Sequence, residues 1–204
     1  MRKKNKKSLY SLFLIILIIL LLLFIFINMT KNKKNGNNIN SQKIVDSIVN
    51  LNNYTAKIKV QVNSNKNQNK YILFQKYNSQ DGSVQEVIEP ENIAGVKLIK
   101  KNNNLSIENS ILDLKTIFEN YNGLEDNSLD LTNFINEYRE NHSSYYEEKN
   151  EEIIMTTKSN KENKYLKNKK LYIDKKSIKP KKLIINDNNQ NTTIIIEYIE
   201  VELN

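Results

Sequence analysis

The chain has 204 residues, with 31 Lys and Arg against 23 Asp and Glu, so its formal net charge is +8. It contains no cysteine, one histidine and four glycines. This composition excludes disulfides, cysteine-ligated zinc and a lipid-modified cysteine, and it argues against a glycine-rich phosphate-binding loop.

The first 30 residues carry the strongest pattern in the sequence. An apolar run of 19 residues from Leu9 to Ile27 follows five cations, which are Arg2, Lys3, Lys4, Lys6 and Lys7. As a helix this run spans about 28 Å, close to the ~30 Å hydrocarbon core of a bilayer. It ends in Asn28, Met29 and Thr30 without a small-residue cleavage site. We therefore expect residues 1–30 to form an uncleaved transmembrane anchor with a cytoplasmic N-terminus.

Residues 31–43 are polar without periodicity, which is typical of a flexible tether. Residues 44–204 then form one extracytoplasmic domain of a single-pass protein at the cell membrane. All five cations of the N-terminal tip lie before residue 30, and residues 31–204 have 26 cations against 23 acids and a net charge of +3. Because a nucleic-acid surface needs a basic stripe with stacking aromatics, we expect no nucleic-acid partner.

The body divides its charge between two stretches. Residues 108–152 contain twelve acids and three cations, whereas residues 158–182 contain eleven lysines and two acids. Two interpretations stay open. The stretches are either two solvated faces or a surface matched in charge to a partner.

The early body predicts one helix and an antiparallel meander. Ser41 is a suitable N-cap for a helix whose apolar face ends at Leu51. Apolar and polar residues alternate from Tyr54 to Val62, which predicts a half-buried strand. Further strands are predicted at residues 71–77 and 84–88 across the Asp81-Gly82 turn, and at 96–100 and 105–107.

In the middle of the body the spacing of apolar residues changes from that of a strand to that of a helix, and towards the end it changes back. Leu114, Ile117, Phe118 and Tyr121 recur at helical spacing and predict a second helix, and Thr132 is a suitable cap for a third helix through residue 138. Strands are predicted again at residues 152–158, 164–166, 170–174, 181–186 and 192–203. The fold class is α+β, with a large curved antiparallel sheet, or half-barrel, and helices packed on one face.

The sequence contains few candidates for catalytic residues. His142 follows Arg139-Glu140-Asn141 without a nucleophile-elbow motif, which is typical of an exposed loop histidine. The acidic pair Glu147 and Glu148 is typical of solvated strand charges. We therefore expect no catalytic residues, no metal site, no cofactor and no enzymatic activity.

Two sets of segments carry a resemblance to known families. Residues 171–183, with Asp174 starting a turn and Pro180 opening the next strand, and residues 193–204 resemble the closing strands of LolA-like lipoprotein-carrier domains. The second set resembles the GerS family of germination lipoproteins of spore-forming clostridia, which share the LolA-like fold; it comprises residues 85–96, 105–109, 117–121 and 129–135.

The GerS resemblance implies a non-enzymatic protein needed for germination. Such proteins bind a spore-cortex N-acetylmuramoyl-L-alanine amidase during sporulation and license its activity, and any zinc of that system belongs to the amidase. The resemblance also implies the intermembrane space of the developing spore as a location. In this chain the lipidation cysteine is missing, and the N-terminal helix replaces the lipid. Whether the chain is the germination protein or a paralogue with another client stays open.

Two functions from different classes follow from these patterns. In the first, the domain docks a cell-wall amidase, and the candidate contact residues are Glu86, Glu89, Pro90, Glu108, Asn109, Glu119, Tyr121 and Asp130. In the second, the domain is a LolA-type carrier at the cell membrane that holds a lipid or lipoprotein in an apolar cavity, and the candidate lining residues are Ile58, Val60, Leu73, Phe74 and Ile196. A permanent anchor disfavours a shuttling carrier without excluding local lipid handling.

Overall fold

A computed structural model describes residues 40–64, 66–109, 111–121, 128–159 and 165–204. The predicted transmembrane anchor over residues 1–30 lies outside these residues, as does most of the predicted tether. None of the helices in the described ranges is long and apolar enough to span a membrane.

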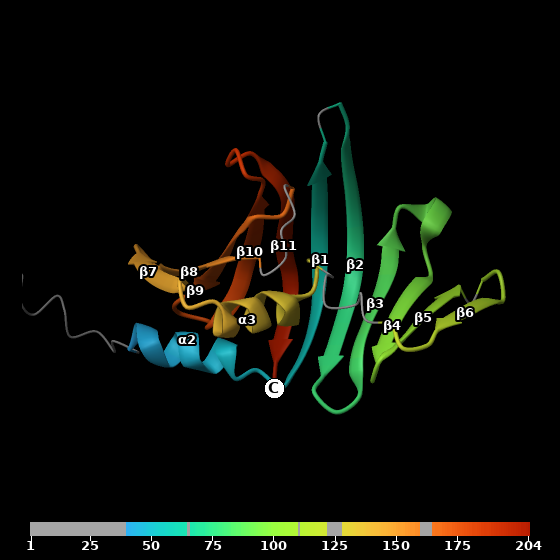
Figure 1. Cartoon of the computed structure of the whole chain (residues 1–204), viewed down its shortest axis with the longest axis horizontal. Helices are drawn as coiled ribbons and strands as arrows, with labels where there is room; N and C mark the ends of the chain where they lie inside the picture. The colour runs from blue at the N-terminus through green and yellow to red at the C-terminus, as the bar shows by residue number, and fades with distance from the viewer. Residues whose placement is uncertain (1–39, 65, 110, 122–127, 160–164) are drawn as a thin grey trace, which may run out of the picture. The chain divides into compact units, whose positions relative to one another are not determined.

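Eleven antiparallel strands form one sheet in the described part of the chain, in the order β6-β5-β4-β3-β2-β1-β11-β10-β9-β8-β7 (Figure 1). The strands of the first half are β1 (Asn53–Asn63), β2 (Gln68–Asn78), β3 (Gly82–Glu89), β4 (Val96–Lys101), β5 (Asn104–Asn109) and β6 (Leu114–Phe118). Those of the second half are β7 (Tyr145–Lys149), β8 (Glu152–Lys158), β9 (Asn168–Asp174), β10 (Lys179–Asn186) and β11 (Thr192–Leu203). The first and last strands meet in the middle of the sheet.

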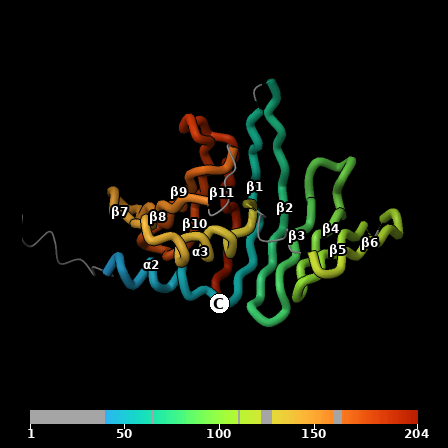
Figure 2. The backbone as a smooth tube through the Cα atoms, viewed as in Figure 1, coloured from blue at the N-terminus to red at the C-terminus, as the bar shows by residue number. Residues whose placement is uncertain are grey.

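Three helical segments accompany the sheet within the described ranges. They are α2 (Ser41–Val49), α3 (Leu131–Glu140) and the short 3-10 helix η1 (Glu91–Ile93). Helices α2 and α3 contact each other and both contact β8. In Figure 2 they cross the half of the sheet that contains β8 to β11, and neither lies over β4 to β6.

Alternation along the central strands decides which side chains the helices cover. Val60 lies opposite Ile196 of β11 on one side and opposite Tyr71 of β2 on the other, so these side chains share one face of the sheet. We call it the helix face. Val60 and Ile196 are fully buried there, packed in one core with Phe134 of α3 and Ile48 of α2. The predicted strand over residues 54–62 is thus confirmed, as is the large antiparallel sheet with helices.

The predicted helix over residues 114–121 is wrong, because this segment forms strand β6. Asp113 and Asn120 have positive φ values of 50° and 51°, which place a turn at each end of a strand of only five residues. A helix this short gains few internal hydrogen bonds, whereas pairing along β5 satisfies the backbone of a whole strand edge. The spacing of Leu114, Ile117 and Phe118 is compatible with either structure.

The predicted helix caps are displaced by one and two residues. The side chain of Asn40, and not that of Ser41, accepts a hydrogen bond from the N–H of Gln42 at the start of α2. The side chain of Asp130, and not that of Thr132, caps α3. Helix α2 begins at Ser41, within the range predicted for the tether. The predicted strand at 170–174 lies within β9, which begins at Asn168. Residues 165 and 166 of the strand predicted at 164–166 are not in a strand, and residue 164 lies outside the described residues.

Candidate protein-interaction surface

Strands β3 to β6 form the part of the sheet that the core does not reach, and we call it the wing. Within the described residues, the main core takes side chains from β1, β2, β8, β9, β10 and β11 but none from β4, β5 or β6. Val87 of β3 is only partly buried against this core. Within the described residues, strands β4 to β6 therefore lack the contacts with the main core that bury the rest of the sheet.

The wing carries large apolar side chains that remain in contact with water. Their exposed fractions run from 37% to 74%, and the residues are Ile88, Ile107, Ile111, Leu112, Leu114, Ile117, Phe118 and Tyr121. Scattered single apolar residues on a surface are ordinary, but contiguous exposed apolar residues mark interaction sites. Leu114 and Phe118 lie on the helix face of β6, opposite Asn109 and Leu105 of β5, so these two side chains extend the helix face into the wing.

The opposite face of the wing carries a ladder of alternating charges. Glu86, Lys97, Glu108 and Lys115 stand directly opposite one another across β3, β4, β5 and β6. Lys97 Nζ lies 3.4 Å from Glu86 Oε2, and Lys115 Nζ lies 2.8 Å from Glu108 Oε1. Hydrogen bonds from Lys115 and then from Ser106 hold the pKa of Glu108 below its usual range. Two predicted contact residues, Glu86 and Glu108, are thus already paired on the surface, where an ion pair contributes little to stability.

Five other predicted contact residues lie at the ends of the wing strands. Glu89 ends β3 and Pro90 follows it, just before η1. The side-chain oxygen of Asn109 accepts hydrogen bonds from the N–H groups of the two residues that start the next turn, at 3.0 and 3.2 Å. Glu119 and Tyr121 follow β6, and the ring of Tyr121 lies 6.0 Å from that of Phe118. The structure therefore gathers seven of the eight predicted contact residues in the wing.

Asp130 is the exception, and its predicted role on the surface needs correction. Its side chain is buried, and Oδ1 accepts hydrogen bonds from the Tyr54 hydroxyl at 2.6 Å and from the Thr132 N–H at 3.1 Å. Burial, and then the nearby Asp130 carboxylate, raise the pKa of Tyr54 well above its usual value. Burial and Asp130 raise the pKa of Tyr198 as well. Asp130 thus joins α3 to β1 instead of facing a partner.

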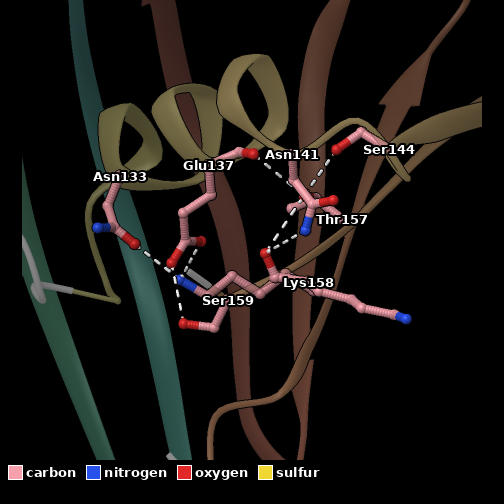
Figure 3. A network of polar contacts seen from close by, with 8 residues as sticks. Asn133, Glu137, Asn141, Ser144, Thr157, Lys158 and Ser159 are labelled. Carbon is pink, nitrogen blue, oxygen red and sulfur yellow. Dashed lines mark hydrogen bonds and ion pairs between the residues drawn. The ribbon is translucent and has the colours of Figure 1, made fainter. Parts of the chain in front are cut away.

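A second buried polar cluster joins the first turn and the middle of α3 to the sheet (Figure 3). Lys169 of β9 is almost completely buried, with Nζ 2.5 Å from Glu137 Oε2 and 2.7 Å from Asn133 Oδ1. The hydroxyl of Ser159 donates to Glu137 Oε1 at 3.0 Å. We did not predict this cluster from the sequence. The sequence does carry a signal, because Lys169, Leu171 and Ile173 are spaced by two residues and therefore lie on the same, buried face of their strand.

The five residues predicted to line an apolar cavity do not share one face. Ile58, Val60, Leu73 and Ile196 are buried in the core. Phe74 lies opposite Lys57 and Glu86, on the face with the charge ladder, and is 38% exposed. This corrects the prediction of a common cavity, because the alternation of β2 separates Leu73 from Phe74.

A groove of about 510 Å³ lies elsewhere, where β10 and β11 diverge. Its lining includes Lys181, Tyr198 and Val201, and it includes none of the predicted cavity residues. Its walls mix charged and apolar side chains, so it is not an apolar lipid site.

The described residues assemble no group of three His, Cys, Asp or Glu side chains that would hold a metal ion. His142 lies exposed in the turn between α3 and β7. What the arrangement offers chemically is an exposed apolar strand edge with charged residues around it.

Comparison with known proteins places the chain in a family. A family model described as "Sporulation protein YdcC-like" matches residues 10–204. A search among curated proteins found no match. The solved structure of the CwlD amidase from Clostridioides difficile in complex with the GerS lipoprotein matches with a TM-score of 0.53 and 20% identity, over 99% of this chain and 98% of that chain.

Two other solved structures match the chain at lower identity. An uncharacterized conserved protein from Thermus thermophilus matches with a TM-score of 0.52 and 10% identity, over 80% of this chain and 87% of that chain. The LolA superfamily protein NE2245 from Nitrosomonas europaea matches with a TM-score of 0.43 and 9% identity, over 80% of this chain and 93% of that chain.

The described residues define a class of protein, an open antiparallel sheet with two helices over one half, and this fold is shared with a chain of the solved structure that contains GerS and CwlD. Within that class, the chain belongs to the YdcC-like sporulation protein family.

Proposed function

We propose that this chain is a non-enzymatic partner that binds a spore-cortex N-acetylmuramoyl-L-alanine amidase of its own organism during sporulation and licenses its activity, as germination requires. The observation that carries the proposal is the match, along nearly the full length of both chains, to the structure that contains GerS bound to the CwlD amidase. Membership of a sporulation protein family supports the same role. The wing supplies exposed apolar side chains for such a partner.

The proposed location is the cell membrane, with the body outside the cytoplasm and, in the developing spore, in the intermembrane space. The cations before residue 8 and the apolar run to Ile27 support this topology. A membrane tether would keep the sheet domain close to an enzyme that works on the adjacent cortex. Protection of the body from protease in intact protoplasts would contradict it.

The test uses the full-length chain in detergent micelles and the cortex amidase made in the same sporulating cell. We expect the chain alone to release no product from cortex peptidoglycan and an equimolar mixture to raise amidase activity by about tenfold, a typical coupling between two proteins. Binding that saturates at a fixed ratio of chain to amidase, measured by titration calorimetry, would establish the complex. Absence of both binding and activation would overturn the proposal.

The carrier function remains a second candidate because the exposed apolar residues of the wing, such as Leu114 and Phe118, also suit an acyl chain. Its test is organic extraction of the full-length chain purified from its own organism. Stoichiometric acyl lipid together with no amidase binding would favour the carrier.

A further inference from the structure

The two edges of the sheet differ in how they are protected. Edge strand β7 contains Glu147, Glu148 and Lys149, and charged residues on an edge discourage the addition of another strand. Glu148 is also engaged, since its Oε2 accepts a hydrogen bond of 2.5 Å from the Ser41 hydroxyl of α2 and its Oε1 pairs with Lys175. The β7 edge is therefore closed to pairing by charge and by contacts with its own chain.

Edge strand β6 lacks this protection. In the described sheet it pairs with β5 alone, and all five of its residues are exposed. Three of the five are large and apolar, and the single charged residue, Lys115, is neutralised by Glu108. In Figure 1, β6 is the outermost strand of the wing. An exposed apolar edge strand is the kind of element that binds an extended segment of another chain by backbone hydrogen bonds.

An added strand would find apolar contacts on both faces of β6. Leu114 and Phe118 point to the helix face, and Ile117 points to the face with the charge ladder, because Ile117 lies opposite Ser106 and Phe118 opposite Leu105. The exposed fractions of Leu114, Ile117 and Phe118 are 60%, 53% and 42%. The turns at Asp113 and Asn120 limit the pairing segment to five residues, or about 17 Å of strand.

The charges at the ends of β6 determine which kind of strand can pair with it. Asp113 and Glu119 flank the strand, are exposed, and make no ion pair with any described residue. Antiparallel pairing of two copies that uses all five residues is centred on Thr116. That register places Asp113 of each copy opposite Glu119 of the other, and like charges directly opposite are destabilising. A strand with cations at its ends fits instead.

We infer that β6 is a strand-addition site for an extended segment of the amidase, with apolar side chains on both faces and a Lys or Arg near each end. This inference rests on the proposed function and specifies which surface performs it. The partner strand becomes the twelfth strand of the sheet, and its cations meet Asp113 and Glu119.

Hydrogen exchange of the full-length chain with and without the amidase locates the contact. We expect binding to slow exchange of backbone amides in residues 114–118 and to leave those of β7 unchanged, because only the β6 edge gains hydrogen bonds. Binding that leaves β6 exchange unchanged would overturn the strand-addition site while the proposed function stands. Absence of binding would overturn both.

Matched variants test the apolar contacts. Replacing Ile117 by Thr keeps a β-branched residue, and the same change at Ile199 of β11, which is 51% exposed, is the control. We expect Leu114→Thr with Ile117→Thr to weaken amidase binding by about tenfold, and Ile199→Thr to change it within about twofold. Unaltered thermal unfolding of each variant shows that its fold is intact. Equal effects of the β6 and β11 variants would contradict the site.

Neutral variants test the charges. Asp113→Asn with Glu119→Gln keeps the shapes, and Asn also tolerates the positive φ at position 113. We expect these changes to weaken binding by about threefold at low salt and to remove most of its salt dependence. If they instead promote amidase binding, the occupant is not a cation-flanked partner strand. The same conclusion follows if sedimentation shows that the wild-type chain is a dimer that Leu114→Thr with Ile117→Thr dissociates.

Discussion

The covered half of the sheet and the wing are built from the same antiparallel strands with the same alternation of side chains, yet they differ in what the apolar residues do. In the half under α2 and α3, residues such as Ile58, Ile153 and Leu183 are fully buried. In the wing, Leu114 and Ile117 are more than half exposed. The difference lies in the second layer, because a sheet face becomes a core only where helices cover it. Stability should therefore reside in the covered half, and recognition in the wing.

The sharpest test of this comparison is the same substitution in both parts. Val60→Asp places a carboxylate in the core without a partner, and we expect a loss of about 4 kcal/mol or more in the free energy of unfolding. Leu114→Asp in the wing should cost less than about 1 kcal/mol, because the new carboxylate stays in water. Chemical denaturation of both variants measures this difference. Similar losses would show that the wing is as closely packed as the core.

The next largest difference in stability is expected between a buried ion pair in the covered half and an exposed ion pair in the wing. Lys169→Met leaves Glu137 buried without its cation, and we expect a loss of about 3 kcal/mol in the free energy of unfolding. The double variant with Glu137→Leu should recover most of this loss, because no buried charge then remains. Lys115→Met, which breaks an exposed pair in the wing, should leave thermal unfolding unchanged. A double variant no more stable than Lys169→Met would show that packing, and not charge, dominates at this cluster.

Two acidic residues that the sequence predicts as partner contacts, Asp130 and Glu119, should differ clearly in their effect on stability. Asp130→Ala removes the cap of α3 and the acceptor of the buried Tyr54 hydroxyl, so we expect a loss of about 2 kcal/mol. Asp130→Asn should retain part of that stability, because Asn also caps helices. Glu119→Ala should change the free energy of unfolding by less than about 0.5 kcal/mol. Unfolding curves of the three variants distinguish these outcomes.

Alkaline pH should weaken the covered half through Tyr54. Its pKa is raised in the folded protein, so the contribution is complete below the unfolded tyrosine value and is lost as pH rises toward the folded value. We expect Tyr54 to add a loss of about 1.4 kcal/mol per pH unit above about pH 10. Tyr54→Phe should be less stable at pH 7 by about 1 kcal/mol, the value of the lost hydrogen bond, and should show a shallower decline above pH 10. Parallel declines for the two proteins would exclude this role.

The sequence by itself determined the strands with a clear period of two. The strand predicted at residues 54–62 is β1, and those at 152–158 and 192–203 are β8 and β11, because alternation records which side chains face a core. The family resemblance was also readable from short segments, and the family model and the GerS structure bear it out at the level of the family and the fold. The transmembrane anchor remains a prediction.

Only the tertiary structure decided the rest, because the deciding interactions join residues far apart in the chain. Pairing with β5 makes residues 114–118 a strand, although their spacing also suits a helix. The hydroxyl of Tyr54, 76 residues away, makes Asp130 a core residue. The ion pair with Glu137 allows Lys169 to be buried in the interior. In the described part of the chain, α2 and α3 lie over one half of the sheet and not over the wing, and no local pattern in the sequence records where a second layer ends.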